Sequence, residues 1–240
     1  MAFANPSVVI YDITNDRVLG GSLDNTELSI ASISKLMTVY TILQENQNLS
    51  EILTVTGKRT PNTKIRKGMK LSRLDLINLT LISSDNLAAQ TLAENFPKGH
   101  SNFVFHMNQH STNLNMVNTR FVEPTGLSPM NYSTISDIIL LTQAVSDYDI
   151  INKAAQVRSV TVQTKQGKKN IKITSNSTSM FFGREGIVAI KTGFTRAAGF
   201  CITMLVHSNQ QVFNITILGA KTKRERQLIV ETFLKTINNA

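Results

Sequence analysis

The spacing of apolar residues changes period twice along this chain, and this change constrains the fold more than any other feature. Residues 7–21 and 158–220 carry the alternation and short apolar runs of strands, whereas residues 36–155 repeat apolar residues at helical spacing. Strands at both ends around a helical middle predict an α+β fold, with a five-stranded antiparallel sheet covered by helices and a mostly helical lobe inserted into it. We expect residues 1–240 to form a single domain.

Individual elements follow from this pattern and from turn and cap residues. Strands are expected over residues 7–12, 17–21, 160–162, 171–173, 187–191, 199–207 and 211–219. The turn between the third and fourth of these strands is expected at Gln166-Gly167-Lys168. Helices are expected over residues 32–44, 72–82, 87–93, 101–113, 134–146 and 223–237, with Ser72, Ser101 and Thr134 as N-caps.

Ser32 and Lys35 are three residues apart where the first helix begins, so their side chains lie on one face of its first turn. A serine hydroxyl becomes an effective nucleophile when a nearby base takes its proton, and a lysine that burial keeps neutral can be this base. The free N–H groups at the helix start, including that of Ser32, can bind a developing oxyanion. Taken alone, the pair also fits a capping serine beside a solvated lysine.

Ser84 and Asn86 lie where two predicted helices are interrupted, so both side chains can project into a cleft. Ser84 can relay a proton to a leaving group, and Asn86 can hold Lys35 and a substrate amide. Asp85 is expected to point away from the cleft and to have no catalytic role. A helix-capping turn is the structural alternative for all three residues, since Ser, Asp and Asn are common in such turns, and it is the better interpretation for Asp85.

Lys191-Thr192-Gly193 ends an apolar strand. The lysine can attract a substrate carboxylate, Thr192 offers a hydroxyl, and Gly193 lets a ligand lie close to the backbone. We expect the N–H of Phe194 to be the second oxyanion donor, and Thr195 to add another hydroxyl on the same strand edge. Alone, this string also fits a charged strand end beside a bend.

Together and in this order, the three strings match the S-x-x-K, S-D-N and K-T-G set of penicillin-binding proteins and class A β-lactamases. The chain resembles the low-molecular-mass penicillin-binding proteins, the D-alanyl-D-alanine carboxypeptidase and endopeptidase family, from about residue 8 to residue 238. The segments that carry the resemblance are 31–38 (ASISKLMT), 83–89 (SSDNLAA), 121–128 (FVEPTGLS), 191–195 (KTGFT) and 198–200 (AGF).

This resemblance implies a transpeptidase-like domain with the penicillin-binding protein/β-lactamase-like fold. It implies a serine D,D-peptidase that acts on peptidoglycan stem peptides and that β-lactam antibiotics inhibit covalently. By the same resemblance, Ser32 is the acylated nucleophile, Lys35 is its base, and the further site residues are Ser84, Asn86 and Lys191. Arg224, in the first turn of the last helix, is the match for a family arginine near the substrate carboxylate.

Three functions stay open within this resemblance. The FVEPTGLS segment and the early end of the chain favour the endopeptidase over the carboxypeptidase, although Lys191 can pair with the carboxylate of either substrate. A serine β-lactamase is the main alternative, and it needs a base that activates water, for which Glu123 is the acidic residue in a suitable loop. A non-enzymatic penicillin-sensing domain is the third possibility.

The charge balance of 25 Lys and Arg against 16 Asp and Glu gives a net charge of +9. We do not expect nucleic-acid binding, because the basic clusters are short and no aromatic residues interleave with them. A basic exported protein is instead attracted to an anionic cell wall. No apolar stretch approaches the ~20 residues of a membrane helix. Ala2-Phe3-Ala4 has the form of a signal-peptidase site, so we expect a periplasmic or exported protein whose leader has been removed.

Cysteine and histidine are two further residue types that can carry chemistry. Cys201 is the only cysteine, and its apolar neighbours predict a small buried hydrophobe rather than a nucleophile. His106 and His110 are four residues apart on a predicted helix, but Met107 stands where a metalloprotease motif has glutamate. We expect this pair to face solvent and expect no metal site. No glycine-rich phosphate loop or dinucleotide fingerprint is present, so no cofactor is expected.

Overall fold

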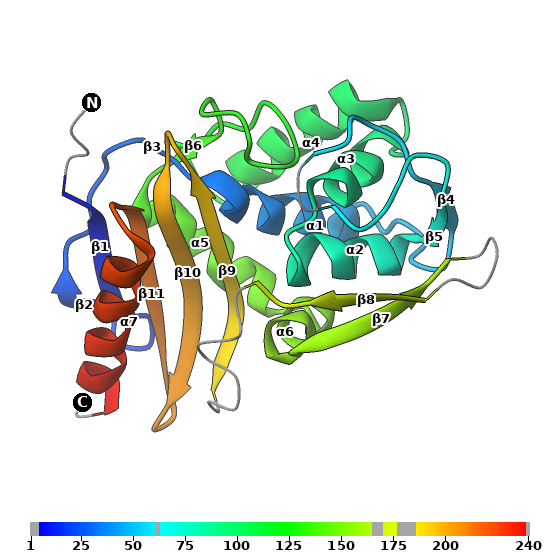
Figure 1. The fold of residues 1–240 in the computed structure, drawn as a ribbon. Coiled ribbons are helices and arrows are strands. Elements are labelled where there is room, and N and C mark those ends of the chain that lie inside the picture. Colours follow the sequence, from blue (N-terminus) through cyan, green and yellow to red (C-terminus); the bar gives the residue numbers. More distant parts are fainter. Residues whose placement is uncertain (1–4, 61–62, 165–169, 177–185, 239–240) are drawn as a thin grey trace.

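The structure, a computed structural model, describes residues 5–60, 63–164, 170–176 and 186–238. Its main sheet has five antiparallel strands in the order β2-β1-β11-β10-β9, which confirms the predicted five-stranded sheet (Figure 1). The strands are β1 (Ser7–Asp12), β2 (Arg17–Gly21), β9 (Ile187–Thr195), β10 (Gly199–Ser208) and β11 (Gln211–Ala220). Strand β1 pairs with β11, so strands from the two ends of the chain lie side by side.

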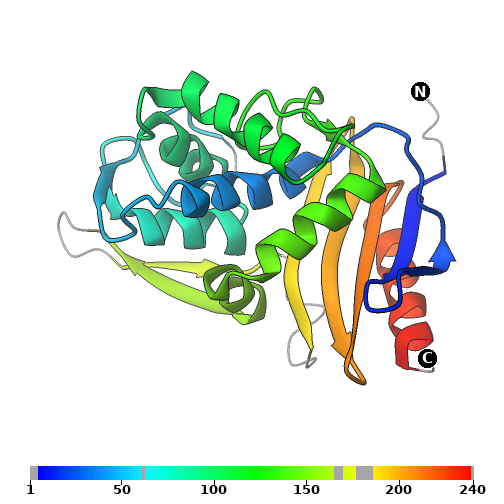
Figure 2. The same cartoon turned by 180° about the vertical axis from the view of Figure 1, so that it is seen from behind.

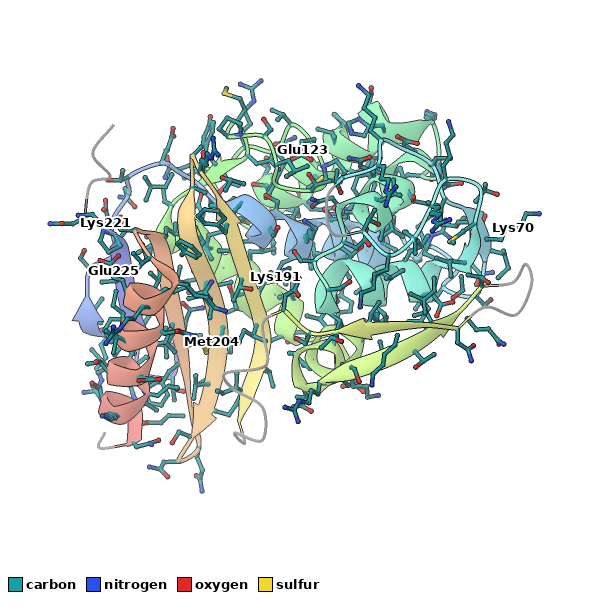
Figure 3. The ribbon with its side chains drawn as sticks, viewed as in Figure 1. Lys70, Glu123, Lys191, Met204, Lys221 and Glu225 are labelled. Carbon is teal, nitrogen blue, oxygen red and sulfur yellow. The ribbon has the colours of Figure 1, made fainter. Side chains whose placement is uncertain are left out.

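Helices cover both faces of this sheet, because its central strands are apolar on both sides. Helix α7 (Lys223–Asn238) packs on one face, in a core that includes Met204 of β10 (Figure 3). Helix α5 (Ile135–Ser146) crosses the opposite face, as Figure 2 shows from behind. There the hydroxyls of Thr142 on α5 and Thr203 on β10 lie 2.8 Å apart. Successive residues of β10 thus point to opposite layers, as strand geometry requires.

The other helices form a second part of the molecule beside β9, the strand at one edge of the sheet (Figure 1). Helix α1 (Ser34–Gln44) runs through the middle of this part, and all its residues from 34 to 42 are buried. Around it lie α2 (Arg73–Ile82), α3 (Asn86–Glu94), α4 (Gly99–Asn113) and the short strands β3 (Leu28–Ser29), β4 (Ile52–Thr54), β5 (Lys70–Ser72) and β6 (Tyr132–Ser133). Strand β3 pairs with β6, and β4 pairs with β5.

Two of the predicted helix caps are confirmed and one is wrong. The Ser72 side chain accepts from the N–H of Asp75 in a complete capping box. The Thr134 side chain accepts from the N–H of Asp137 at the start of α5. Ser101 caps nothing, because α4 begins at Gly99. Lys98 before it has a left-handed backbone (φ 62°), which turns the chain after Phe96 and lets the helix begin earlier.

The first helix also begins later than predicted. Residues 31–33 form a 3-10 turn, η1 (Ala31–Ile33), and α1 follows at Ser34. Ala31 has a positive φ of 46°, which does not belong in an α-helix. Ser32 is therefore part of a tight turn ahead of α1, and it is not the first residue of the α-helix.

The region assigned to the second sheet segment, 158–220, divides into two sheets. Strands β7 (Ser159–Gln163) and β8 (Asn170–Thr174) pair only with each other among the described residues and pack against α2. Their apolar residues lie on one buried face, so this hairpin covers a helix instead of entering a sheet that is buried on both sides. The turn predicted at 166–168 lies outside the described residues.

Two helices differ from the predicted division of the chain into sheet segments and a helical lobe. Helix α6 (Asp149–Gln156) was not predicted separately, and α5, which falls within the predicted lobe of residues 36–155, packs on the main sheet. No helix of the described residues is long and apolar enough to cross a membrane.

Candidate active site

Ser32 on η1 and Lys35 on α1 are in contact: the Nζ of Lys35 lies 3.1 Å from the Oγ of Ser32. The same nitrogen donates to the Oδ1 of Asn86 at 2.7 Å and to the carbonyl oxygen of Thr125 at 2.6 Å. Both of these oxygens can only accept, so they hold two N–H groups of the lysine. When Lys35 is neutral, its lone pair is therefore left for the hydroxyl proton of Ser32.

Burial lowers the pKa of the Lys35 ammonium group to about 7, because the side chain is fully buried and its charged form loses hydration. The negative charges of Glu123 and Asp85 act in the opposite direction and raise this pKa. Desolvation is the larger effect. A substantial fraction of Lys35 is neutral near pH 7, which is what a base for Ser32 requires.

Residues 83–85 join α2 to α3, and Asn86 is the first residue of α3. Ser84 has a left-handed backbone (φ 56°), which breaks the helical path. Asp85 caps α3 through its carboxylate, which accepts from the N–H groups of Leu87 and Ala88 at 2.9 and 3.1 Å, so its predicted capping role is confirmed. Its charge nevertheless acts on the site, since it raises the pKa of Lys35.

Lys191 on β9 faces Ser84 across the boundary between the sheet and the helical part (Figure 3). Its Nζ donates to the Oγ of Ser84 at 3.1 Å and to the carbonyl oxygen of Thr192 at 2.8 Å. Burial lowers the pKa of Lys191 well below its ordinary value, and the positive charges of Lys35 and Arg226 lower it further. Both lysines of the site are thus buried, one in contact with Ser32 and the other with Ser84.

Strand β9 passes very close to η1 at Gly193. A Cβ at this position would lie 2.7 Å from the backbone nitrogen of Ser32 and 2.9 Å from the Cβ of Ala31. Such separations are too short for a side chain, so only glycine lets the strand approach the nucleophile. The two predicted oxyanion donors, the N–H groups of Ser32 and Phe194, therefore belong to segments that face each other.

A cavity of about 330 Å³ lies over these residues. It is lined by Ser32, Ser83, Ser84, Asp85, Asn86, Asn176, Thr192, Gly193, Phe194, Phe200, Lys223 and Arg226. Lys35 and Lys191 lie beneath it and are fully buried. A larger cavity of about 550 Å³ lies at the other end of β9, where Ile187 and Val206 line it together with residues of α7. The chemistry-bearing side chains gather at the smaller one.

Besides the buried Lys35 and Lys191, two more predicted site residues, Thr195 and Arg224, do not line the site cavity. Thr195 uses its hydroxyl oxygen in the β9–β10 turn, where it accepts from the N–H of Ala198 at 3.0 Å. Arg224 is exposed on α7, and the arginine that lines the cavity is Arg226, which is 7 % exposed and donates to the carbonyl oxygen of Cys201. Residues two apart on a helix lie on nearly opposite sides. Arg226 shares the buried stripe of α7 with Val230, a periodicity that the sequence itself displays.

Sequence reasoning considered Glu123 only as a base for a β-lactamase, and it missed the role that the structure gives this residue. Its carboxylate accepts from the backbone N–H groups of Thr125, Gly126 and Ser128. It also accepts from the side-chain amide of Asn131. These bonds fix the loop whose Thr125 carbonyl binds Lys35 (Figure 3 labels Glu123 on this loop).

Cys201 is fully buried, as predicted. Burial raises the pKa of its thiol to about 11, so the nucleophilic thiolate is scarce at neutral pH.

The prediction that His106 and His110 face solvent is wrong. The Nδ1 of His106 and the Nε2 of His110 lie 2.7 and 3.0 Å from the Oε1 of Glu45. Glu45 follows the end of α1, some sixty residues earlier in the chain, so the local spacing of the histidines gave no sign of it.

The fold and the site together define a serine peptidase whose nucleophile is paired with a lysine. A family model described as D-alanyl-D-alanine carboxypeptidase matches residues 2–222. The chain belongs to this family, and it is a serine-type D-Ala-D-Ala peptidase.

Curated relatives carry two kinds of name. The chain is 34 % identical to the D-alanyl-D-alanine endopeptidase of Escherichia coli strain K12 and 33 % identical to that of Pseudomonas aeruginosa, in each case over 90 % of this chain and 72 % of the relative. It is 25 % identical to the D-alanyl-D-alanine carboxypeptidase DacF of Bacillus subtilis, over 98 % of this chain and 62 % of the relative.

Solved structures share the fold. The Streptomyces K15 DD-transpeptidase superposes with a TM-score of 0.87 at 19 % identity, and the match covers 100 % of both chains. Penicillin-binding protein D2 from Listeria monocytogenes, in its cefotaxime-bound form, superposes with a TM-score of 0.82 at 25 % identity over 98 % of both chains.

Proposed function

We propose that this peptidase hydrolyses D-alanyl peptide bonds of peptidoglycan through an acyl-enzyme on Ser32, with bonds that cross-link two stem peptides as its preferred substrate. The observation that carries the proposal is the environment of Lys35. Its Nζ is buried, held by two oxygens that only accept, and 3.1 Å from the Oγ of Ser32. The lone pair of a neutral lysine in this position is directed to the hydroxyl proton of Ser32.

In the first half-reaction, Lys35 takes the proton of Ser32 while the Oγ attacks the carbonyl carbon of the D-alanyl residue. The carbonyl oxygen becomes an oxyanion, which the N–H groups of Ser32 and Phe194 stabilise. The close approach of Gly193 to the backbone of Ser32 supports this role, since it brings the two donor segments together. Asn86 keeps Lys35 in place and holds the substrate amide.

Collapse of the tetrahedral intermediate breaks the peptide bond, and the leaving amine needs a proton. Ser84 is the proposed donor, because its hydroxyl lies in the cavity and its Oγ accepts from Lys191. The hydroxyl gives its proton to the amine, and the ammonium group of Lys191 replaces that proton. Water then attacks the carbonyl carbon of the ester on Ser32, and Ser84 passes a proton of this water to the neutral Lys191. Lys35 returns its proton to the Oγ of Ser32 as the ester bond breaks, so both lysines regain their starting states.

The substrate carboxylate beyond the scissile bond is assigned to Arg226 and Thr192, which both line the cavity. Arg226 replaces the predicted Arg224, which is exposed. Lys191 acts on the carboxylate through its field rather than by contact, because it lies beneath the cavity and is bonded to Ser84. A guanidinium group suits this task, since it binds a carboxylate through two parallel hydrogen bonds.

The preference for cross-links rests on the relatives, because the motifs serve both reactions. The relatives at 33 and 34 % identity are named endopeptidases, whereas DacF, at 25 %, is named a carboxypeptidase. Chromatography of purified muropeptides after incubation with the enzyme tests the preference. We expect cross-linked dimers to disappear as monomers form. Pentapeptides shortened to tetrapeptides with dimers unchanged would instead identify a carboxypeptidase.

Penicillin and other β-lactams are proposed to acylate Ser32 and to leave slowly. The alternative, a β-lactamase, needs a base that activates water, and Glu123 has its carboxylate committed to the N–H groups of its own loop. Labelled penicillin should remain covalently bound to the wild type and be absent from Ser32→Ala. Rapid turnover of a chromogenic cephalosporin would favour the β-lactamase.

The proposed substrate lies outside the cytoplasmic membrane, so we also propose that the protein is exported and acts in the periplasm or cell wall. Its net charge of +9 supports attraction to an anionic wall. Cell fractionation with an antibody against the protein tests this location, and recovery in the cytoplasm would contradict it.

A further inference from the structure

A second cluster of chemistry-bearing side chains lies away from the active site, between the far end of α1 and one face of α4. It consists of Glu45, His106 and His110. We propose that these three residues bind one divalent transition-metal ion, of which Zn²⁺ is the best match, and that this ion ties α1 to α4.

The positions of the ligand atoms support the proposal. The Oε1 of Glu45, the Nδ1 of His106 and the Nε2 of His110 all lie within 4.8 Å of one another. In a tetrahedral zinc site, with bonds of about 2.0–2.1 Å, ligand atoms are separated by about 3.4 Å. The oxygen is already 2.7 and 3.0 Å from the two nitrogens, so small side-chain rotations make room for an ion.

The helix presents both imidazoles to the same point, because residues four apart lie on one face of an α-helix. Aromatic rings hold them there. The Tyr40 ring packs edge-on against His110, with ring centroids 5.7 Å apart, and Phe96 packs against His106 at 5.3 Å. Preformed ligand orientation of this kind reduces the ordering that metal binding requires.

The chemistry of the ligand atoms also suits a transition metal. Two imidazoles and one carboxylate favour Zn²⁺, Co²⁺ or Ni²⁺ over Mg²⁺ and Ca²⁺, which prefer oxygen ligands alone. The side chain of Glu45 is 28 % exposed, whereas those of His106 and His110 are 22 % and 11 % exposed, so water can complete the coordination.

The position of this cluster at the end of α1 indicates what a bound ion would do. Ser32 precedes the start of α1, and Glu45 follows its end. An ion at this end fixes the helix that carries Lys35 without touching the cavity residues. We therefore assign it a structural role, and acylation of Ser32 should not depend on it.

The test is titration of the metal-free enzyme with Co²⁺ and Zn²⁺ at pH 7.5. We expect one equivalent of Co²⁺ to give the visible absorption of a four-coordinate site, and Zn²⁺ to displace it. Calorimetry should show binding of one Zn²⁺, and the Tm should rise with Zn²⁺ concentration. Penicillin labelling should be the same with and without chelator.

Glu45→Gln and His106→Asn are the site variants, and each removes one of the three protein ligands. Each should lose the Co²⁺ absorption and bind Zn²⁺ more weakly by at least about 10–100-fold, the loss that follows removal of an outer-shell partner alone. The matched controls are His100→Asn on the same helix and His207→Asn on β10, which should bind as the wild type does. Penicillin labelling reports that each variant is folded. An absence of binding to the wild type, or equal binding by Glu45→Gln, would overturn the proposal.

Discussion

Gly193 has no room for a side chain, because its missing Cβ would lie 2.7 Å from the backbone nitrogen of Ser32. The approach brings the β9 edge against the turn that carries the nucleophile. A methyl group added at residue 193 would therefore push these two segments apart.

Gly193→Ala should therefore lower the rate of penicillin acylation by at least about 100-fold, since removal of one oxyanion donor alone has an effect of this size. Stopped-flow labelling measures the rate, and the Tm reports stability, which we expect to fall by about 1–3 kcal/mol through overpacking. Gly20→Ala is the control, because its Cβ would meet nothing closer than 3.6 Å. Near wild-type acylation by Gly193→Ala would contradict the close approach.

Acylation should follow the ionisation of Lys35. Burial lowers its pKa to about 7, and the neutral amine is the active form. The rate should therefore be low below pH 6, rise through a single ionisation near pH 7 and level off above about pH 8. A midpoint near the ~10.4 of free lysine would contradict this assignment.

Lys35→Arg tests the same base in another way. Arginine keeps its positive charge at every accessible pH, so acylation should fall by about 10²–10⁴-fold, the usual contribution of a general base. Lys70→Arg, at an exposed position of β5 far from the site, should be unaffected (Figure 3). A Lys35→Arg enzyme that acylates like the wild type would exclude the lysine as base.

Arg226 and Arg224 form a matched pair on α7. Arg226→Ala should reduce kcat/KM for a peptide that ends in a free carboxylate by about 10–100-fold, as expected for a hydrogen bond between charged groups. The same peptide with an amidated end should be affected much less, which separates carboxylate recognition from a structural role. Arg224→Ala should leave both rates unchanged. Equal losses in the two variants would assign the effect to the net charge of the helix.

Glu123→Gln distinguishes a loop-positioning residue from a deacylation base. The negative charge of Glu123 raises the pKa of Lys35, so its removal should shift the acylation midpoint to lower pH. The maximal acylation rate should also fall, because the loop that holds the Thr125 carbonyl loses acceptors. Exposed Glu94→Gln is the control. A change confined to deacylation would instead support the β-lactamase alternative.

The sequence predicted the main sheet and the helix starts at Ser72 and Thr134, because strand periodicity and caps act locally. It misplaced the helix starts at Ser32 and Ser101. It also supplied Ser32, Lys35, Ser84 and Asn86, which the structure brings together around one cavity. These residues belong to short sequence motifs, and the order of the motifs along the chain is enough to identify the site.

The missed roles of Glu123 and Glu45 share a physical cause, which is contact between distant segments. Glu123 acts through a loop that meets Lys35 across 90 residues, and Glu45 meets His106 across 61. Neither contact leaves a periodic trace in the sequence. Arg226 is different, since its place on the buried stripe of α7 could have been read from helical spacing.

The pairing of β1 with β11 has a consequence for when the enzyme becomes active. The five-stranded sheet cannot form until β11 has been synthesised, because β1 pairs with it. Lys191 bonds to Ser84, which lies 107 residues earlier in the chain. Long-range closure of this kind is slow and comes late in folding. A chain that is still emerging from the ribosome, or only partly across a membrane, therefore has a serine without the β9 edge that supplies Lys191 and Gly193. The nucleophile becomes reactive only after the last strands of the main sheet have been synthesised and paired.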